Sequence, residues 1–261
     1  MPLIYGCQYV MTIVFTKYNL ITKQKTEQMK KLLSNGSSNA KTKKNDRPTK
    51  ILYMKPSEVE GKEMCPFATK GCRAACLNTS GMGVFSNVQE SRYNRTLMYV
   101  RNKKKFLEQI AKEINGSAKF YARKGKEFAV RLNGTSDQPL VESLIKQEGI
   151  HHNAVFYDYT KNPKKPGERY LPSGHRYVVA LSYSGENKKE CIEALKRGAI
   201  VATVFDTKKG DDLPSKWHGF NVVDGDERDD LMLDVPSGTV LGLRAKGKAK
   251  NDTSGFVVQV K

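Results

Sequence analysis

Short apolar runs alternate with amphipathic segments through most of the chain. The runs predict strands at residues 51–54, 128–132, 155–159, 177–181, 199–205 and 220–223. Apolar residues at helical spacing predict helices at residues 84–100, 103–114, 140–146 and 188–197. Strands that alternate with helices are typical of a parallel sheet buried on both faces. We therefore expect an α/β fold, organised as a partial or incomplete (β/α) barrel of mainly parallel strands.

The chain divides into three expected segments. Residues 1–50 form an N-terminal extension and a basic segment, with a short helix predicted at 27–33. Residues 51–235 form the α/β domain that would carry the chemistry. Residues 236–261 hold two apolar runs around a basic, glycine-bearing loop, which predicts a small β-hairpin appendage of the same domain.

Three of the five cysteines are concentrated in one short segment. Cys65, Cys72 and Cys76 have the spacing C-x6-C-x3-C. One helical turn would place the sulfurs of Cys72 and Cys76 on the same face, and a hinge at Gly71 would let Cys65 fold back over it. Three thiolates that converge without a nearby fourth ligand favour an iron–sulfur site over a closed zinc site.

Other interpretations of the cysteines remain open. The three residues could be free thiols, or one disulfide and a spare cysteine. A zinc site could be completed by distant Cys7, Cys191 or a histidine, although Cys191 begins an amphipathic helix and is expected in the core. Lys62, Lys70 and Arg73 surround the cysteines with positive charge, and we expect this charge to lower the thiol pKa values.

Polar residues gather where the predicted strands end. Clusters of Asn, Ser, Thr, Asp or Glu occur at residues 133–137, 160–163, 182–187, 206 and 224–226. Because the carboxyl ends of parallel strands meet at one rim, these residues would line a common site beside the cysteines. The expected lining includes Asn133, Ser136, Lys161 and Glu186, with Asp137 and Asp158 as the candidate catalytic or ligand-holding carboxylates.

The overall charge points to anionic partners. A formal net charge of +18 and a pI near 9.6 favour nucleic acid, nucleotide phosphates or an anionic cluster, although a lysine-rich composition can also track an AT-rich genome. The apolar run at 9–15 is too short to span a bilayer and lacks the flanks of a signal peptide. We expect no membrane association and, from the odd cysteine count, a reducing compartment.

Several long motifs resemble the bacteriophage gene product 88 family. They are Asn39-Ala40-Lys41-Thr42, the cysteine segment with residues 75–81, Arg131-Leu132-Asn133-Gly134-Thr135-Ser136-Asp137, residues 157–163 and Asp224-Gly225-Asp226. They occur in the same order over residues 32–261. The resemblance implies a phage protein located in the host cytoplasm and does not imply a mechanism.

A more distant, architectural resemblance is to the radical S-adenosylmethionine (SAM) enzymes. Those enzymes hold a [4Fe–4S] cluster with three cysteines, spaced C-x3-C-x2-C rather than as here, and they carry a Gly-Gly-Glu motif that this chain lacks. The likeness implies a [4Fe–4S] cluster and SAM as cofactors. It places Asn133, Gly134 and Ser136 at the methionine amine, and Ser182 and Glu186 at the ribose.

Two functions follow as expectations. The first is an iron–sulfur protein with redox or SAM-type chemistry at an open iron, which would make it an enzyme. The alternative is a basic protein that binds nucleic acid or a host protein and uses a cluster or zinc only for structure. Its contact surface would come from basic stretches at residues 41–47, 103–105, 161–165 and 244–250.

Overall fold

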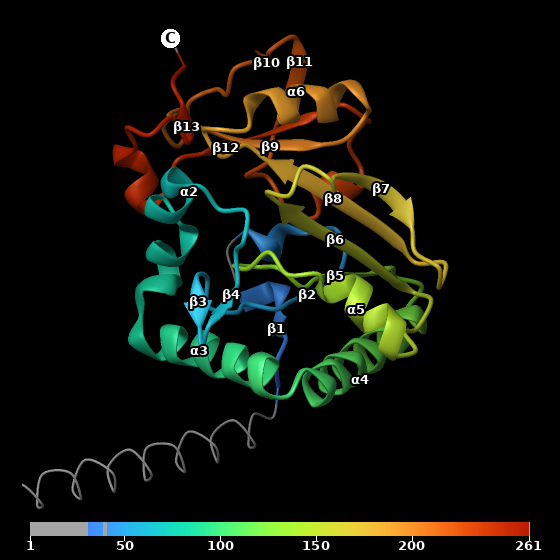
Figure 1. Ribbon diagram of the computed structural model, residues 1–261. Helices are drawn as coiled ribbons and strands as arrows, with labels where there is room; N and C mark the ends of the chain where they lie inside the picture. The colour runs from blue at the N-terminus through green and yellow to red at the C-terminus, as the bar shows by residue number, and fades with distance from the viewer. Residues whose placement is uncertain (1–30, 39–40, 261) are drawn as a thin grey trace, which may run out of the picture.

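The computed structural model describes residues 31–38 and 41–260 (Figure 1). The apolar run at 9–15, Cys7 and residues 27–30 of the predicted helix lie outside this part. Leu32 and Leu33 are not helical. Their backbone N–H groups donate to the carboxylate of Glu113, at 2.7 and 3.0 Å.

One sheet dominates the described residues, with eleven strands and the main order β1-β2-β5-β6-β8-β9-β12-β11-β10. Its parallel part comprises β2 (Thr49–Ile51), β5 (Phe128–Arg131), β6 (Ala154–Thr160), β8 (Arg176–Ser182), β9 (Val201–Phe205), β12 (Val240–Arg244) and β11 (Phe220–Asp224). Antiparallel pairs add β1 (Ser34–Asn35), β7 (Gly167–Tyr170) and β10 (Lys216–Trp217). The predicted α/β class with a mainly parallel sheet is confirmed.

Helices cover one face of this sheet. They are α3 (Ser86–Arg101), α4 (Lys103–Ala122), α5 (Leu140–Gln147) and α6 (Lys188–Lys196), seen in Figure 1 around the strands. Successive residues of a strand point to opposite faces. Phe156 of β6 accordingly packs with the core of α4 and α5, whereas Val155 and Tyr157 pack with Met232 and Leu233 on the other face.

The C-terminal segment is part of the sheet, and the predicted hairpin over 236–261 is wrong. β12 lies between β9 and β11 and is parallel to both. β13 (Val257–Val258) also pairs in parallel with β9. The two apolar runs therefore do not pair with each other. Gly242 suits the interior of β12, because a Cβ there would lie only 2.7 Å from the Val222 side chain.

A second, two-stranded sheet introduces the cysteine segment. β3 (Glu58–Val59) and β4 (Lys62–Glu63) pair antiparallel, and Cys65 follows two residues later. Within residues 31–38 and 41–260, no helix is long and apolar enough to cross a membrane.

Candidate functional site

The cysteine segment is held at the carboxyl ends of the parallel strands. Its short helix α2 (Lys70–Ala74) begins at Thr69, whose hydroxyl oxygen accepts from the Cys72 backbone N–H at 3.2 Å. The same hydroxyl donates to the carbonyl of Ser184 at 2.8 Å, in the loop that follows β8. The predicted position of the cysteines at this rim therefore agrees with the contacts.

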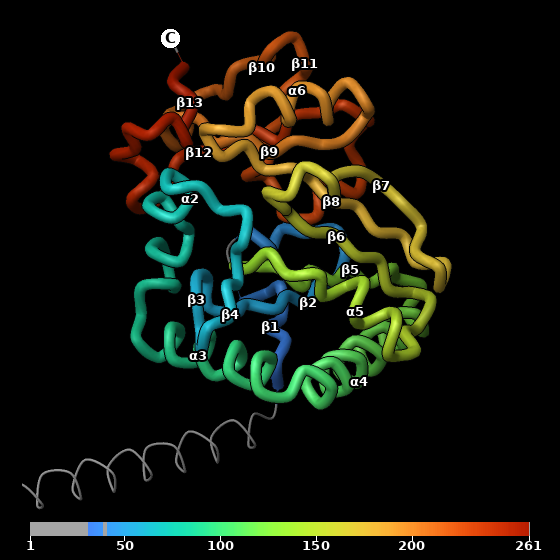
Figure 2. Tube along the Cα trace, in the orientation of Figure 1, coloured from blue at the N-terminus to red at the C-terminus, as the bar shows by residue number. Residues whose placement is uncertain are grey.

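The other side of α2 rests on the end of the chain. Ala75 packs with Ala249 and Val257, and a Cβ at Gly71 would overlap the Ser254 hydroxyl. Figure 2 shows α2 beside the C-terminal segment. Gly71 is thus a helical residue at a close approach, and the predicted hinge there is wrong. The helix ends at Ala74, so Cys76 lies beyond it and not on the same helical turn as Cys72.

The three thiols are unpaired, half-buried and near one another. Burial raises the pKa of Cys65 to about 11, and a charge on Cys76 adds to this. Burial also raises the pKa of Cys76, with a contribution from Cys72. The expectation that neighbouring cations lower these pKa values is therefore wrong for Cys65 and Cys76. In the described part of the chain, no three Cys, His, Asp or Glu side chains are arranged as a ready metal site.

Two cations interact with the thiols: Lys161, which was expected to line this rim, and Arg92, which was not. Burial acts to lower the pKa of Lys161, but the charges of Cys72, Asp137 and Cys65 outweigh it and raise the value. Arg92 of α3 is only 8% exposed, and its charge and that of Cys76 interact. By contrast, Arg73 forms an ion pair with Glu63 at 3.1 Å.

Asp137 joins three loops at this rim. Its carboxylate accepts from the Thr160 hydroxyl at 2.9 Å and from the Lys161 backbone N–H at 2.9 Å. Its own backbone N–H donates to the carbonyl of Met64 at 2.8 Å, the residue before Cys65. The loops after β5 and β6 are thereby tied directly to the cysteine segment.

Asn133, Ser136 and Asp158 form a buried hydrogen-bonded cluster beneath Asp137. Asp158 accepts from the backbone N–H and the side-chain amide of Asn133, at 2.8 and 3.1 Å. The Asn133 amide oxygen in turn accepts from the Ser136 hydroxyl at 3.0 Å. Burial raises the pKa of Asp158 to about 7, a value suited to proton transfer at neutral pH.

The raised pKa of Asp158 predicts a pH-dependent stability. A carboxyl whose folded pKa exceeds its unfolded value stabilises the fold fully below about pH 4, and this contribution is lost as the pH rises through about 7. The Asp158→Asn variant cannot ionise, so we expect it to lose less stability between pH 5 and pH 8, by on the order of a few kcal/mol. Urea unfolding of both proteins across this range measures the difference; equal pH profiles would contradict the prediction.

Gly134, expected at a cofactor, has a packing role in this structure. A Cβ at this position would lie 2.6 Å from the Tyr53 ring and 2.7 Å from the Leu52 carbonyl oxygen. We expect Gly134→Ala to lower the free energy of unfolding by about 1–3 kcal/mol through overpacking. Gly149→Ala, where nothing lies within 4 Å, is the matched control and should stay within about 1 kcal/mol of wild type. A change of equal size in both variants, measured by urea unfolding, would refute this assignment.

Ser182 and Glu186 are less closely connected to the cysteines. The Ser182 carbonyl accepts from the Asn187 amide at 3.1 Å, and Glu186 is exposed. Among the described residues, no hydrogen bond or ion pair joins either side chain to the cysteine segment. The hydrogen bond from the Thr69 hydroxyl to the Ser184 carbonyl joins their loop to the cysteine segment.

A buried ion cluster on the opposite face of β5 and β6 was not predicted from the sequence. Asp229 accepts from Arg131 at 3.0 Å and from the Tyr157 hydroxyl at 3.0 Å, and it pairs with Lys41 at 3.4 Å. Burial acts to raise the pKa of Asp229, but Arg131 and Lys41 outweigh it and hold the value at about 2. In the sequence, Asp229 belongs to a run of charged residues in the loop after β11. Such a run is ordinarily expected in solvent, so it gave no indication of a buried cluster.

These features define an α/β protein with three neighbouring, half-buried thiols at the carboxyl-end rim of a mainly parallel sheet. The family model described as Gene product 88 matches residues 20–260, so the chain belongs to this bacteriophage family. No curated protein and no solved structure matches the chain. The comparisons lend no support to the likeness to radical SAM enzymes.

Proposed function

We propose that this phage protein binds an iron–sulfur cluster through Cys65, Cys72 and Cys76. The observation that carries the proposal is that three unpaired, half-buried thiols lie at one rim of the sheet, where each interacts electrostatically with the Lys161 ammonium group. Thiolates are the usual ligands of such clusters, and a cluster with three of them leaves one iron open. In this proposal the main sheet is curved into an incomplete (β/α) barrel, and the cluster lies at the carboxyl ends of its strands.

The charges around the thiols suit an anionic cluster. A [4Fe–4S] centre with thiolate ligands carries net negative charge, which nearby cations stabilise. Lys161 and Arg92 supply that charge from two sides, from the end of β6 and from α3. Neither cation forms an ion pair with a carboxylate side chain among the described residues at 4.0 Å or less, so both remain able to respond to a bound anion.

When bound, the cluster would supply redox chemistry or an open iron for a small ligand such as SAM. Asp137 would hold that ligand or move a proton beside Cys65, since its charge and the Cys65 thiol interact. Asp158, behind it, would take up or release a proton near neutral pH. Asn133, Gly134 and Ser136 would fix the loop that carries Asp137, and Ser182 and Glu186 would line the outer edge.

Metal analysis of protein purified without air tests the proposal. We expect brown protein that contains iron and acid-labile sulfide, with a paramagnetic signal after reduction. Added SAM should change that signal if it binds the open iron. Stoichiometric zinc without iron would overturn the proposal and leave a structural zinc site, and the absence of any bound metal would overturn both.

A further inference from the structure

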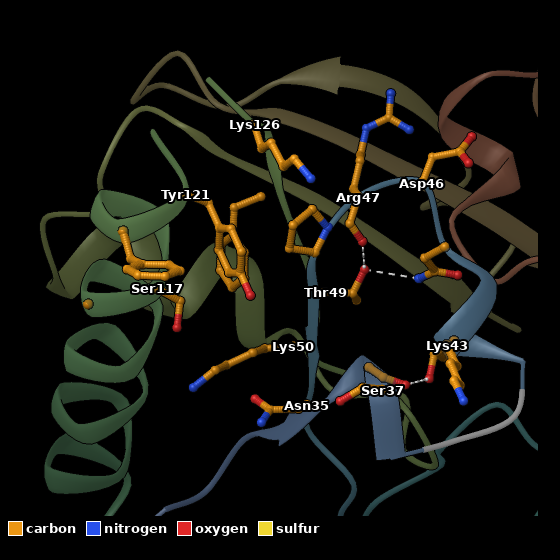
Figure 3. A pocket seen from close by; sticks show the side chains of 17 residues that line it. Asn35, Ser37, Lys43, Asp46, Arg47, Thr49, Lys50, Ser117, Tyr121 and Lys126 are labelled. Atoms are coloured by element: carbon orange, nitrogen blue, oxygen red, sulfur yellow. Dashed lines mark hydrogen bonds between the residues drawn. The ribbon is translucent and has the colours of Figure 1, made fainter. Parts of the chain in front are cut away.

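A second site lies at the other end of the strands from the cysteines. A pocket of about 650 Å³ is open at the amino ends of β2 and β5 (Figure 3). Its walls are the turns η1 (Gly36–Ser38) and η2 (Thr42–Lys44) on one side and the C-terminal half of α4 on the other. Its volume suits a ligand of nucleotide size.

The pocket is lined by lysines that no described residue neutralises through an ion pair. Lys43, Lys50 and Lys126 line it, and none of the three forms an ion pair with a described residue at 4.0 Å or less. The charged groups beside them are already paired. Arg47 contacts Glu127 at 2.6 Å and Asp234 at 2.8 Å, and Asp46 contacts Arg228 at 3.2 Å.

An aromatic wall completes the pocket. Phe120 is 44% exposed, and its ring meets the Tyr121 ring edge-on, with centroids 5.1 Å apart. Tyr121 is stacked on the buried Phe128 ring at 5.6 Å, which fixes its position. Lys124 makes a cation–π contact with the Phe120 ring, at 4.3 Å from its centroid. Figure 3 shows Lys50 and Lys126 near Tyr121, on the same side of β2.

We infer that this pocket binds a nucleotide unit of single-stranded nucleic acid. Lysine ammonium groups bind phosphates, and an exposed aromatic ring offers a stacking surface to any base. The two together are the usual combination in proteins that bind single strands, because only an unpaired base can leave its stack to meet a side chain. A free mononucleotide also has a phosphate and a base. It lacks the neighbouring phosphates of a strand, however, and so could not contact all three lysines at once.

Fluorescence anisotropy with a labelled oligothymidylate tests the inference on the full, metal-replete chain. We expect Lys43→Ala, Lys50→Ala and Lys126→Ala combined to weaken binding at least tenfold. The slope of log affinity against log salt should become shallower by about 2, at about 0.7 per lost phosphate contact. Phe120→Ala should weaken binding by about tenfold. Unlabelled duplex and mononucleotide should compete poorly.

Two matched controls separate the pocket from general surface charge. Lys112→Ala, Lys188→Ala and Lys189→Ala combined remove the same charge from exposed positions on α4 and α6, and Tyr170→Ala removes an aromatic side chain that is 71% exposed. Both should bind as wild type does. Equal losses in the pocket and control variants, or no binding at low salt, would overturn the inference, as would a mononucleotide that competes as well as the strand. Iron content measured in the same samples keeps this outcome separate from the proposed cluster.

Discussion

Replacement of Cys72 by serine is expected to abolish cluster binding. Cys72 is the thiol whose charge acts most strongly on Lys161, and it also interacts with Cys76. A serine hydroxyl is a poor ligand for iron compared with a thiolate, and two remaining cysteines hold a cluster badly. We expect iron per chain to fall about tenfold or more, with loss of the brown colour and of the paramagnetic signal.

Cys191→Ala is the matched control for this variant. Cys191 is fully buried in the core of α6, and its burial raises its pKa to about 12. The control removes a thiol without touching the rim, so iron content should stay at the wild-type level. Iron retained by Cys72→Ser, or lost from both variants in proportion to misfolding, would contradict the assignment of these ligands.

Replacement of Asp229 by asparagine is expected to cause the largest loss of stability. The carboxylate is 3% exposed and balances the charges of Arg131 and Lys41 inside the protein. Removing one partner of a buried ion cluster leaves the other charges uncompensated, at a cost of about 3–5 kcal/mol. Urea unfolding at neutral pH measures this loss. Asp212→Asn, at an exposed position, should change the free energy of unfolding by no more than about 0.5 kcal/mol.

The same carboxylate predicts a signature in acid. A folded pKa of about 2, below the unfolded value, means that Asp229 stabilises the fold above about pH 4 and that this contribution is lost as the pH falls toward 2. The wild-type protein should therefore lose stability as the pH falls toward 2. The Asp229→Asn variant has already lost this contribution at neutral pH, so its stability should change less over the same range. Parallel acid profiles for the two proteins would show that the cluster does not act as described.

The strands and helices of the main sheet were predictable because each is marked locally. The apolar runs at 128–132, 155–159 and 177–181 are buried on both faces. A short, continuous apolar run in an otherwise polar chain is typical of a buried parallel strand. The helix expected at 140–146 indicated the parallel pairing of the first two runs, whereas no helix separates the second from the third. The polar residues at strand ends likewise placed Asn133, Asp137 and Asp158 near the cysteine segment.

The pairing of the last strands was not predictable from local pattern. The runs at β12 and β13 are short and separated by a basic turn, as in a hairpin, and the preference of both for β9 depends on contacts far away in sequence. Arg92 was not among the residues expected at the site. It shares one face of α3 with Thr96 and Tyr99, and all three are buried, but a charged residue is expected on the solvent side.

The cysteine spacing was informative about proximity and misleading about conformation. A separation of four residues suggested one helical turn, yet α2 stops at Ala74 because Ala75 turns to pack against Ala249 and Val257. The sequence placed Lys161 at the rim, but its interaction with the thiols became visible only in the structure. Lys161 comes from the loop after β6, and only the folded sheet brings it to the thiols.

The support of α2 by the end of the chain has a consequence for how the protein matures. On the ribosome, residues 65–76 emerge long before Ser254, Phe256 and Val257, which hold α2 in place once β13 has joined β9. Until that late portion is synthesised, α2 lacks its packing against Ala249 and Val257, although Met64 can already be held by Asp137. In the proposed iron–sulfur protein, insertion of the cluster would follow synthesis of this last segment, and the nascent thiols would meet oxidants during translation before α2 is held in place.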